Sequence, residues 1–449
     1  MSRILLLSKD FVDSSMAGPG IRYFQMAKTL AKKLPGNQIT LAAPNKTNMQ
    51  EKEFTTVFYN RTSCFRLISS NDIIISQGFS FELLPFLFFL NKKVILDFYD
   101  PWQMQFLEHT KNFLPFRRTL EYNLGMQHLK LHLLISNFIV CANSRQRDLW
   151  IGMLSDLGIL SASMYDANPT LKNVIDEVPY GIRPDSLKKE KQVLKGVWKG
   201  IEKDDKVIIW NGGIWNWFDP LTLIEVMGDL YKKRKDVKLF FLGTKHPNPI
   251  VKEMEMLNNT VELSKNLNLY DKNIFFNFGW MPYNETKEYL LESDIGVVTY
   301  FNNLETRYSF RTRILDLLWA EIPVVCTRGD CLSEYIEKFT LGIVIDERDR
   351  KALNEAIDKL IDDKQFYEKC KENIKGFKNT FTWEKNLQPI IKFCQNESFN
   401  IKMSKPYFNF VGLFFIHVIN RFFFRLINLY LTLFERIKHI HKPRKNLNL

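Results

Sequence analysis

The sequence predicts an α/β protein made of two doubly wound domains in tandem, followed by a helical tail. Short, continuously apolar runs alternate with segments of helical periodicity, which is typical of parallel strands covered by helices on both faces. The series of runs also begins twice, on either side of a polar, lysine-rich stretch at 186–206. We therefore expect two sheets, each with its own domain, rather than one large sheet.

The expected strands are the apolar runs themselves. In the first domain they lie at 3–8, 38–44, 71–77, 93–100 and 138–144. In the second domain they lie at 207–213, 237–243, 273–279, 294–300, 323–327 and 342–346. Ligands of such sheets bind beyond the carboxyl ends of the strands, so two facing domains predict a site in the cleft between them.

Composition excludes several classes of protein. The chain has 449 residues, of which 45% are hydrophobic and 25% charged, and this argues against a disordered, collagen-like or disulfide-rich protein. The six cysteines include no CxxC pair and no histidine at zinc-ligand spacing, so we expect reduced thiols and no structural metal. The N-terminal apolar run is too short for a signal-peptide core, which favours a cytoplasmic protein.

The basic charge is concentrated at the C-terminal end. Lys and Arg exceed Asp and Glu by 62 to 50, a net charge of +12. Residues 401–449 hold nine basic residues and one acid, so they carry +8, and the remaining residues carry only +4. The body is nearly balanced, and the tail is the basic part of the chain.

A glycine-containing loop follows the first expected strand. Gly18, Gly20 and Arg22 lie where this loop enters a helix with apolar residues at helical spacing. Small residues at a helix start allow a ligand to approach the backbone, and free amides there attract an anion such as a diphosphate. An ordinary tight turn explains the same residues.

The second domain begins with a strand that runs into two glycines and two further tryptophans. Gly212 and Gly213 would let backbone amides reach a ligand, while Trp215 and Trp217 would cover a ring or sugar face. Packing of these tryptophans at the domain interface is the alternative interpretation.

A third segment, residues 305–325, leads from a strand through a loop into a helix. Arg311 and Arg313 lie at the predicted start of this helix, where guanidinium groups would add to the free amides in binding a diphosphate. Asp316, about one turn later, suits either a salt bridge to these arginines or a hydroxyl-rich ligand.

Together these segments resemble glycosyltransferase family 4, whose members are retaining enzymes of the GT-B fold that use nucleotide-sugar donors. The resemblance rests on the sequences AGPGIR, NGGIWNWFDPLTLI and ETRYSFRTRILDLLWAEIPVV, and it spans about residues 1–395. It implies an acceptor-side domain at 1–185, a donor-binding domain at 200–380, a closing helix at 381–400 that returns to the first domain, and a tail at 401–449.

The resemblance also implies roles for individual residues. The family carries two glutamates eight residues apart; the second corresponds to Asp316, which would hold the ribose, and the first corresponds to Tyr308. Glu305 is the only nearby carboxylate and is our candidate for the catalytic residue that approaches the donor sugar. The backbone of Ser309, Phe310 and Arg311 would cap the phosphates.

The chain lacks the Arg and Lys that relatives place after the first strand of the second domain. The charge that neutralises the diphosphate would then come from Arg311, Arg313, Lys245 or Arg22. The loop with Trp280, together with Gly243, would bind the base by resemblance. The family pattern implies neither a metal nor another cofactor.

Asp100 is the candidate catalytic or acceptor-orienting residue of the first domain. It follows a strand and precedes Pro101, and relatives often place a His or Asp at this position. A helix cap before the proline explains Asp100 equally well on local grounds.

Residues 407–438 form a long aromatic and aliphatic segment with one polar stripe at three- and four-residue steps. Arg421 and Arg425 in its middle argue against a helix that spans a bilayer. The pattern favours a helix lying on an anionic membrane surface, and docking on the first domain or a partner subunit is the alternative.

We therefore expect a glycosyltransferase that uses a lipid-linked or surface-polysaccharide acceptor at the cytoplasmic face of a membrane. Its partners would be a nucleotide sugar, a glycan or lipid-linked acceptor, and the anionic membrane surface. The alternatives are a GT-B-fold nucleotide-sugar epimerase and a catalytically inactive sugar-binding or scaffolding subunit. Nucleic-acid binding is not expected, because the basic residues lie within an apolar stripe.

Overall fold

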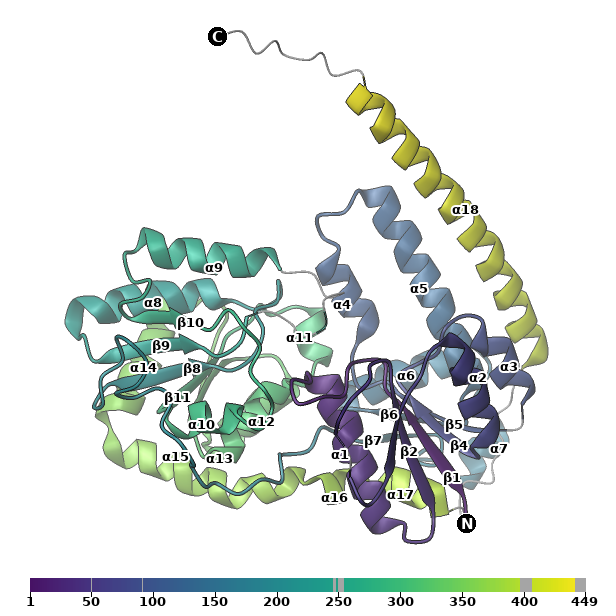
Figure 1. Cartoon of the computed structure of the whole chain (residues 1–449), viewed down its shortest axis with the longest axis horizontal. Helices are drawn as coiled ribbons and strands as arrows, with labels where there is room; N and C mark the ends of the chain where they lie inside the picture. The colour runs from purple at the N-terminus through teal and green to yellow at the C-terminus, as the bar shows by residue number, and fades with distance from the viewer. Residues whose placement is uncertain (50, 91, 245–247, 249–253, 396–405, 441–449) are drawn as a thin grey trace.

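The computed structural model of the chain describes residues 1–49, 51–90, 92–244, 248, 254–395 and 406–440, with 430–440 described as backbone alone. Two α/β domains lie side by side, and one long C-terminal helix extends from the first of them (Figure 1). The predicted fold class is confirmed: each domain has its own parallel sheet with helices around it.

The sheet of the first domain has seven strands in the order β3-β2-β1-β4-β5-β6-β7, all parallel. Their bounds are β1 Arg3–Leu7, β2 Gln38–Ala43, β3 Thr55–Phe58, β4 Ile73–Ser76, β5 Lys93–Asp97, β6 Phe138–Cys141 and β7 Ile175–Glu177. The central strands are buried on both faces, as their continuous apolar sequences require.

Seven helices belong to this domain within the described residues. They are α1 Gly18–Lys33, α2 Arg61–Ser70, α3 Leu83–Phe89, α4 Trp102–His109, α5 Pro115–Ile135, α6 Ser144–Asp156 and α7 Ala162–Ala167. Helix α1 starts directly after the loop that follows β1, so its N-terminus lies at the carboxyl edge of the sheet.

The second domain has six parallel strands in the order β10-β9-β8-β11-β12-β13. They are β8 Lys206–Trp210, β9 Val237–Phe241, β10 Ile274–Phe276, β11 Ile295–Val298, β12 Val324–Thr327 and β13 Gly342–Ile345. Its helices are α8 Pro220–Lys233, α9 Glu255–Asn266, α10 Thr286–Leu291, α11 Leu304–Tyr308, α12 Thr312–Trp319, α13 Cys331–Phe339, α14 Arg350–Asp362 and α15 Lys364–Phe377.

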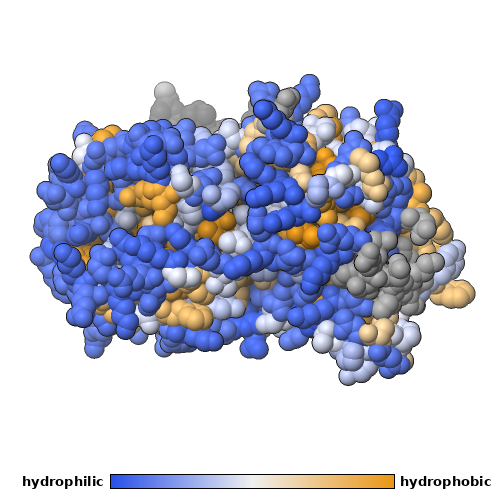
Figure 2. Space-filling view, turned by 90° about the horizontal axis from the view of Figure 1, so that it is seen from below, coloured by the Kyte–Doolittle hydropathy of each residue, from blue (hydrophilic) through white to orange (hydrophobic). Residues whose placement is uncertain are grey.

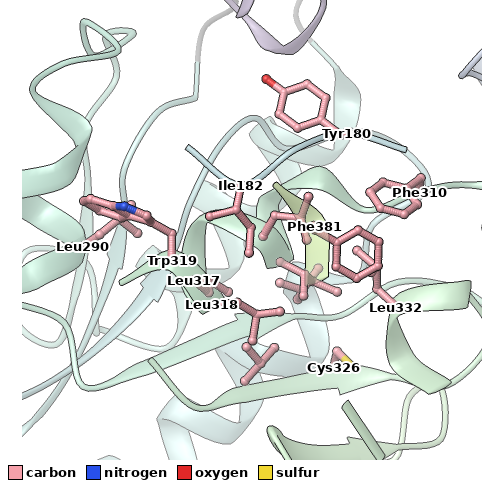
Figure 3. Close-up of a cluster of buried hydrophobic side chains, with 14 of the residues drawn as sticks. Tyr180, Ile182, Leu290, Phe310, Leu317, Leu318, Trp319, Cys326, Leu332 and Phe381 are labelled. Carbon is pink, nitrogen blue, oxygen red and sulfur yellow. The ribbon is translucent and has the colours of Figure 1, made fainter. Parts of the chain in front are cut away.

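The chain crosses between the domains twice at one place. The outgoing segment carries Tyr180 and Ile182, and Ile182 pairs with Thr382 of the returning segment. Figure 3 shows these two outgoing residues beside Phe381 and buried side chains of the second domain, among them Phe310 and Trp319. This shared apolar cluster joins the two domains behind the cleft.

The returning segment continues along the first domain. It consists of a 3₁₀ turn at Lys378–Phe381, α16 Trp383–Asn386 and α17 Gln388–Gln395. Phe393 stacks on Phe138 of β6, with ring centroids 5.2 Å apart, and Glu384 forms ion pairs with Lys32 and Lys33 of α1. The second domain is thereby fastened to the first through both crossings.

The last helix, α18 Tyr407–Ile440, runs along α5 and past α3 (Figure 1). Its first turns are docked through aromatic rings: Phe410 stacks on Phe88 at 3.9 Å and Phe414 on Phe81 at 4.6 Å. Docking on the first domain, one of the two interpretations of the tail, is therefore what the structure shows for this part of the helix.

All the predicted strands are present, and two further strands were missed. Strand β3 lies at the sheet edge and β7 has only three residues, two of them acidic, so neither has a long apolar run. The helix predicted after Arg311 is observed, but a separate short helix, α11, precedes it. All six cysteines are buried and unpaired.

Candidate functional site

A cavity of about 530 Å³ lies between the two domains. Loops that follow β1 and β5 line it from the first domain, and loops that follow β8 and β9, with the start of α12, line it from the second. The site therefore lies at the carboxyl ends of both sheets, where doubly wound folds bind ligands.

Arg313, in the first turn of α12, lines this cavity. Its Nη2 donates to the Gly213 carbonyl at 2.8 Å, and its guanidinium lies 4.0 Å from the centroid of the Phe218 ring. Nη1 is buried without a hydrogen-bond partner, and burial lowers the pKa of Arg313 to about 9. An anionic ligand would supply the missing partner and raise this pKa again.

Arg311, two residues earlier, is held differently. Its Nη1 and Nη2 donate to the two carboxylate oxygens of Glu305, at 3.1 and 2.6 Å, and Nη2 also donates to the Thr306 hydroxyl. Burial alone would lower the pKa of Arg311, but the adjacent carboxylate raises it. Arg311 borders the cavity, yet its charge is already neutralised within the protein.

The structure therefore changes the interpretation of Glu305. The side chain is 1% exposed and is not part of the cavity wall. Its carboxylate accepts hydrogen bonds from Ser309 and Arg311, so it orders the turn between α11 and α12. This places Glu305 behind the site, and the expected contact with a donor sugar is not available in this arrangement.

Asp316 does line the cavity, one turn after Arg313. Burial raises the pKa of its carboxyl to about 6, and the positive charges of Arg183 and Arg313 oppose this rise. Its position beside the donor-side wall suits a hydroxyl-rich ligand. Ser309 and Phe310 also line the cavity, just before the helix start.

The loop after β8 lies beside Arg313 in the wall of the interdomain cavity. Gly212 has φ +108°, and a Cβ there would lie 3.6 Å from Arg313 Nη2, so both backbone conformation and proximity favour glycine. Gly213 provides the carbonyl that holds Arg313. Trp215 and Trp217 stack with centroids 5.4 Å apart, and both line the cavity.

Gly243 and Trp280 lie together on the second-domain wall. A Cβ on Gly243 would meet the Trp280 ring at 3.6 Å, and both residues line the cavity. Lys245, a predicted phosphate ligand, lies outside the described residues.

Asp100 faces the cavity from the first domain. Burial and the nearby charge of Asp97 raise its pKa to about 7, while hydrogen bonds from Tyr99 and Gln105 act in the opposite direction. A carboxyl that titrates near neutral pH can exchange a proton with a substrate hydroxyl. The helix-cap alternative is not observed, because Pro101 occupies the cap position of α4 and no side chain caps that helix.

The glycine-rich loop of the first domain is divided between ligand-facing and structural residues. Gly18 lines the cavity, and its carbonyl accepts a hydrogen bond from Tyr180. Gly20 does not line it: a Cβ there would lie 2.1 Å from the Phe11 carbonyl oxygen, so packing requires the glycine.

Arg22 is likewise not a phosphate ligand. It is 0% exposed, and its Nε and Nη2 donate to Asp97 at 2.8 and 2.7 Å. Nη2 also donates to the carbonyl of Val178, so this ion pair joins α1, β5 and the start of the domain crossing. Asp97 itself is 1% exposed.

Lys9 is a cavity residue that the sequence analysis missed. It follows β1 and lies in the first-domain wall with Gln77 and Asp100. Desolvation lowers the pKa of its amine to about 8, so it remains mostly charged at neutral pH. Its position just beyond the carboxyl end of a central strand was the available signal.

Among the described residues, no three His, Cys, Asp or Glu side chains form a cluster suited to a metal ion. The charged residues that line the cavity are Lys9, Asp10 and Asp100 from one domain and Arg311, Arg313 and Asp316 from the other. Such a set can bind an anion on one wall and orient a hydroxyl on the other.

Comparison with known proteins identifies the second domain. Residues 198–377 match the family model described as glycosyl transferases group 1. A curated protein, probable sucrose-phosphate synthase 2 of Oryza sativa subsp. japonica, is 27% identical over 90 residues. That match covers 20% of this chain and 9% of the rice protein, so the chain matches about a tenth of that relative's length.

Solved structures resemble nearly the whole chain. WaaG, a glycosyltransferase involved in lipopolysaccharide biosynthesis, aligns with a TM-score of 0.59 and 15% identity, over 88% of this chain and 100% of WaaG. Anabaena HepE in complex with UDP-glucose aligns with a TM-score of 0.60 and 12% identity, over 88% and 100%. The protein therefore has the GT-B fold, and its residues 198–377 match the glycosyl transferases group 1 family model.

Proposed function

We propose that this protein is a retaining glycosyltransferase that moves a sugar from a nucleotide-sugar donor to a lipid-linked or surface-polysaccharide acceptor. The observation that carries the proposal is the environment of Arg313. Its guanidinium lies at the cavity wall with one buried nitrogen unpartnered, beside the backbone of Gly212 and Gly213. A diphosphate bound there would satisfy that nitrogen and face the start of α12.

The rest of the cavity fits the two substrates. Asp316 on the donor side would accept hydrogen bonds from the ribose hydroxyls, and Trp280 beside Gly243 would cover the base. Asp100 and Lys9, on the first-domain wall, would contact the acceptor. An acceptor carrying a phosphate would have a charged partner in Lys9, which supports a lipid-linked substrate.

In a retaining transfer, positive charge develops at the anomeric carbon while negative charge develops on the departing diphosphate. Arg313 and the backbone at the start of α12 would stabilise that negative charge without a metal. The departing phosphate would take the acceptor's proton, and Asp100 would orient the acceptor hydroxyl.

The C-terminal helix supports a site of action at a membrane. Tyr407–Leu429 has a mean hydropathy of 1.7 and is only 11% buried, so by length and composition it could cross a bilayer. Its two arginines favour a helix in the interfacial plane of the cytoplasmic leaflet instead. The face of the molecule shown in Figure 2, by contrast, is mostly hydrophilic and has scattered apolar patches.

Transfer assays with a panel of nucleotide sugars test the proposal. UDP-glucose is the first donor to try, because HepE is described in complex with it. The expected result is acceptor-dependent release of the nucleoside diphosphate, with the anomeric configuration of the donor kept in the product. Epimerised donor without acceptor would favour an epimerase, and the absence of any turnover with a bound donor would favour a scaffolding subunit.

A further inference from the structure

A second cavity, of about 480 Å³, lies where the middle of α18 crosses the first domain. Residues from α5, from α18 and from the segment before α3 line it, among them Arg421, Arg425, His128, His417, Ser80 and Glu82. It is separate from the interdomain cavity, with which it shares no lining residue. The proposed sugar transfer gives this second cavity no role.

The charges around this cavity do not cancel. Neither Arg421 nor Arg425 lies within ion-pair distance of a carboxylate among the residues described, and Arg421 is held over the Phe81 ring at 5.1 Å. Glu82, the one acid in the lining, already pairs with Arg61 at 3.1 Å. The two guanidinium groups therefore leave a positive surplus in a concave site.

Two buried polar atoms point to a ligand rather than to a simple basic patch. His417 is 4% exposed, yet its Nδ1 has no hydrogen-bond partner, and the same is true of the buried Nε2 of His128. The rings stack with centroids 5.7 Å apart, and burial lowers the pKa of both to about 4, so both are neutral at physiological pH. A neutral imidazole can still donate one N–H to an anionic oxygen.

The rest of α18 indicates where the ligand comes from. The side of the helix that is not docked carries exposed apolar residues at Phe415, Ile419, Phe422, Phe423 and Leu426. If this side enters the acyl boundary of a membrane, the arginine side lies at the level of the lipid headgroups. Guanidinium forks suit the oxygens of a phosphate at that depth.

We infer that the cavity between α18 and α5 binds the phosphate of an anionic phospholipid headgroup, with Arg421 and Arg425 as charged donors and the unpartnered ring nitrogens of His128 and His417 as further partners. The inference rests on the proposed membrane association, and it adds a defined lipid site to it. Such a site would fix the orientation of the helix, and through α5 that of the first domain, on the membrane.

The test is vesicle co-sedimentation of the full chain with phosphatidylglycerol–phosphatidylcholine and with pure phosphatidylcholine vesicles. Arg421→Gln/Arg425→Gln is compared with Lys442→Gln/Lys445→Gln, which removes the same charge near the C-terminal end of the sequence. Two basic residues near a membrane each add non-specific attraction, so both variants weaken binding. We expect the cavity variant to lose at least about tenfold more affinity than the control.

A second pair of variants leaves every proposed donor in place. Ser80→Glu adds a carboxylate to the cavity lining, whereas Ser163→Glu adds one at an exposed serine of α7. Only Ser80→Glu should weaken vesicle binding strongly, and circular dichroism establishes that both variants fold. Equal losses within either pair would overturn the lipid site in favour of general electrostatic attraction.

Two further outcomes separate the possible sources of the phosphate. Binding of inorganic phosphate by the wild type that is lost in Arg421→Gln/Arg425→Gln, while vesicle binding falls no further than in the control, would contradict a lipid ligand and favour a soluble one. Sugar transfer to a water-soluble acceptor is measured in parallel. If a cavity variant binds vesicles as well as its control does, this inference is wrong and the proposed function is unaffected. If the wild type shows no sugar transfer at all, the proposed function is wrong.

Discussion

Arg311 and Arg313 lie two residues apart at the start of one helix, but their guanidinium groups are used in opposite ways. Arg311 is bound bidentately by the buried carboxylate of Glu305, whereas Arg313 donates to a backbone carbonyl and has aromatic rings as neighbours. The first arginine therefore fixes the turn, and the second is left for a ligand. This division of roles gives rise to two predictions.

Glu305→Gln is expected to destabilise the protein by about 3 kcal/mol, because it leaves the buried Arg311 charge without its partner. Urea unfolding measures the change. Glu337→Gln is the control: it breaks an ion pair with Arg328 at 2.7 Å whose side chains are 55% and 50% exposed, and the loss should be under about 1 kcal/mol. A Glu305→Gln protein with unchanged stability and abolished sugar transfer would restore Glu305 to the chemistry.

Arg313→Gln is expected to weaken nucleoside-diphosphate binding by about ten- to hundredfold, since a charge-assisted contact is lost. Isothermal titration with UDP, GDP and ADP provides the measurement and identifies the base. Arg307→Gln, at an exposed arginine of α11, removes the same charge nearby and should change affinity less than about twofold. Equal losses in the two variants would mean that the phosphates bind elsewhere.

The fold could be predicted because each strand and helix is encoded by a short, continuous segment of the sequence. Each central strand is a short apolar run, and the second series restarts after the lysine-rich stretch, so alternation alone gives the two sheets. Strand β7 was not predicted, because its three residues include two acids and are too few to show a hydrophobic pattern. The strand forms through its pairing with β6.

The site was only partly predictable, because it depends on pairings between distant residues. The motif predicts that Arg22 binds phosphate, but in the structure Arg22 forms an ion pair with Asp97, 75 positions later. Glu305 was predicted to be catalytic, but both of its carboxylate oxygens accept hydrogen bonds from Arg311. The motifs predicted the cavity-lining glycines, Arg313 and Asp316. Lys9 belongs to no motif, and the only sign of its role is its position just after β1.

The rate of transfer is expected to rise with pH through an apparent pKa near 7, because Asp100 has its pKa raised to about 7 and orients the acceptor when ionised. Turnover at saturating donor, measured from pH 5.5 to 8.5, tests this. Asp100→Asn should lower turnover by about two orders of magnitude and remove the rise. A rise that persists in Asp100→Asn would assign the titration to another group, such as Asp316.

Asp100 also makes stability pH-dependent. The folded-state pKa lies above that of an unfolded carboxyl, so the folded state holds the proton more tightly. Stability should therefore fall as pH rises from about 4 to about 7 and then level off, by about 4 kcal/mol from this group. Urea unfolding of Asp100→Asn should show a smaller fall over the same window, and an identical profile would contradict the raised pKa.

Gly212 and Gly213 offer a matched pair of substitutions. Gly212→Ala should destabilise the protein by about 1–2 kcal/mol, because alanine is strained at φ +108°. It should also weaken diphosphate binding, since the new methyl group contacts Arg313. Gly213→Ala has no positive φ, and its Cβ has ordinary contact distances, so its stability should change by less than about 0.5 kcal/mol. Thermal unfolding with and without nucleotide measures both effects, and similar destabilisation by the two alanines would argue against the strain at Gly212.

The apolar side of α18 should bind membranes without contributing to folding. Phe415 and Phe422 are 61% and 60% exposed, whereas Phe410 is 2% exposed and stacks on Phe88. Burial of one phenylalanine contributes about 1.5–3 kcal/mol, so Phe415→Ser/Phe422→Ser should weaken vesicle binding by at least about tenfold and leave thermal unfolding unchanged. Phe410→Ser should instead loosen the docking of the helix, seen as faster hydrogen exchange over α18 and α3. If the exposed pair lowered the unfolding temperature and left vesicle binding intact, the helix would be covered by protein rather than lipid.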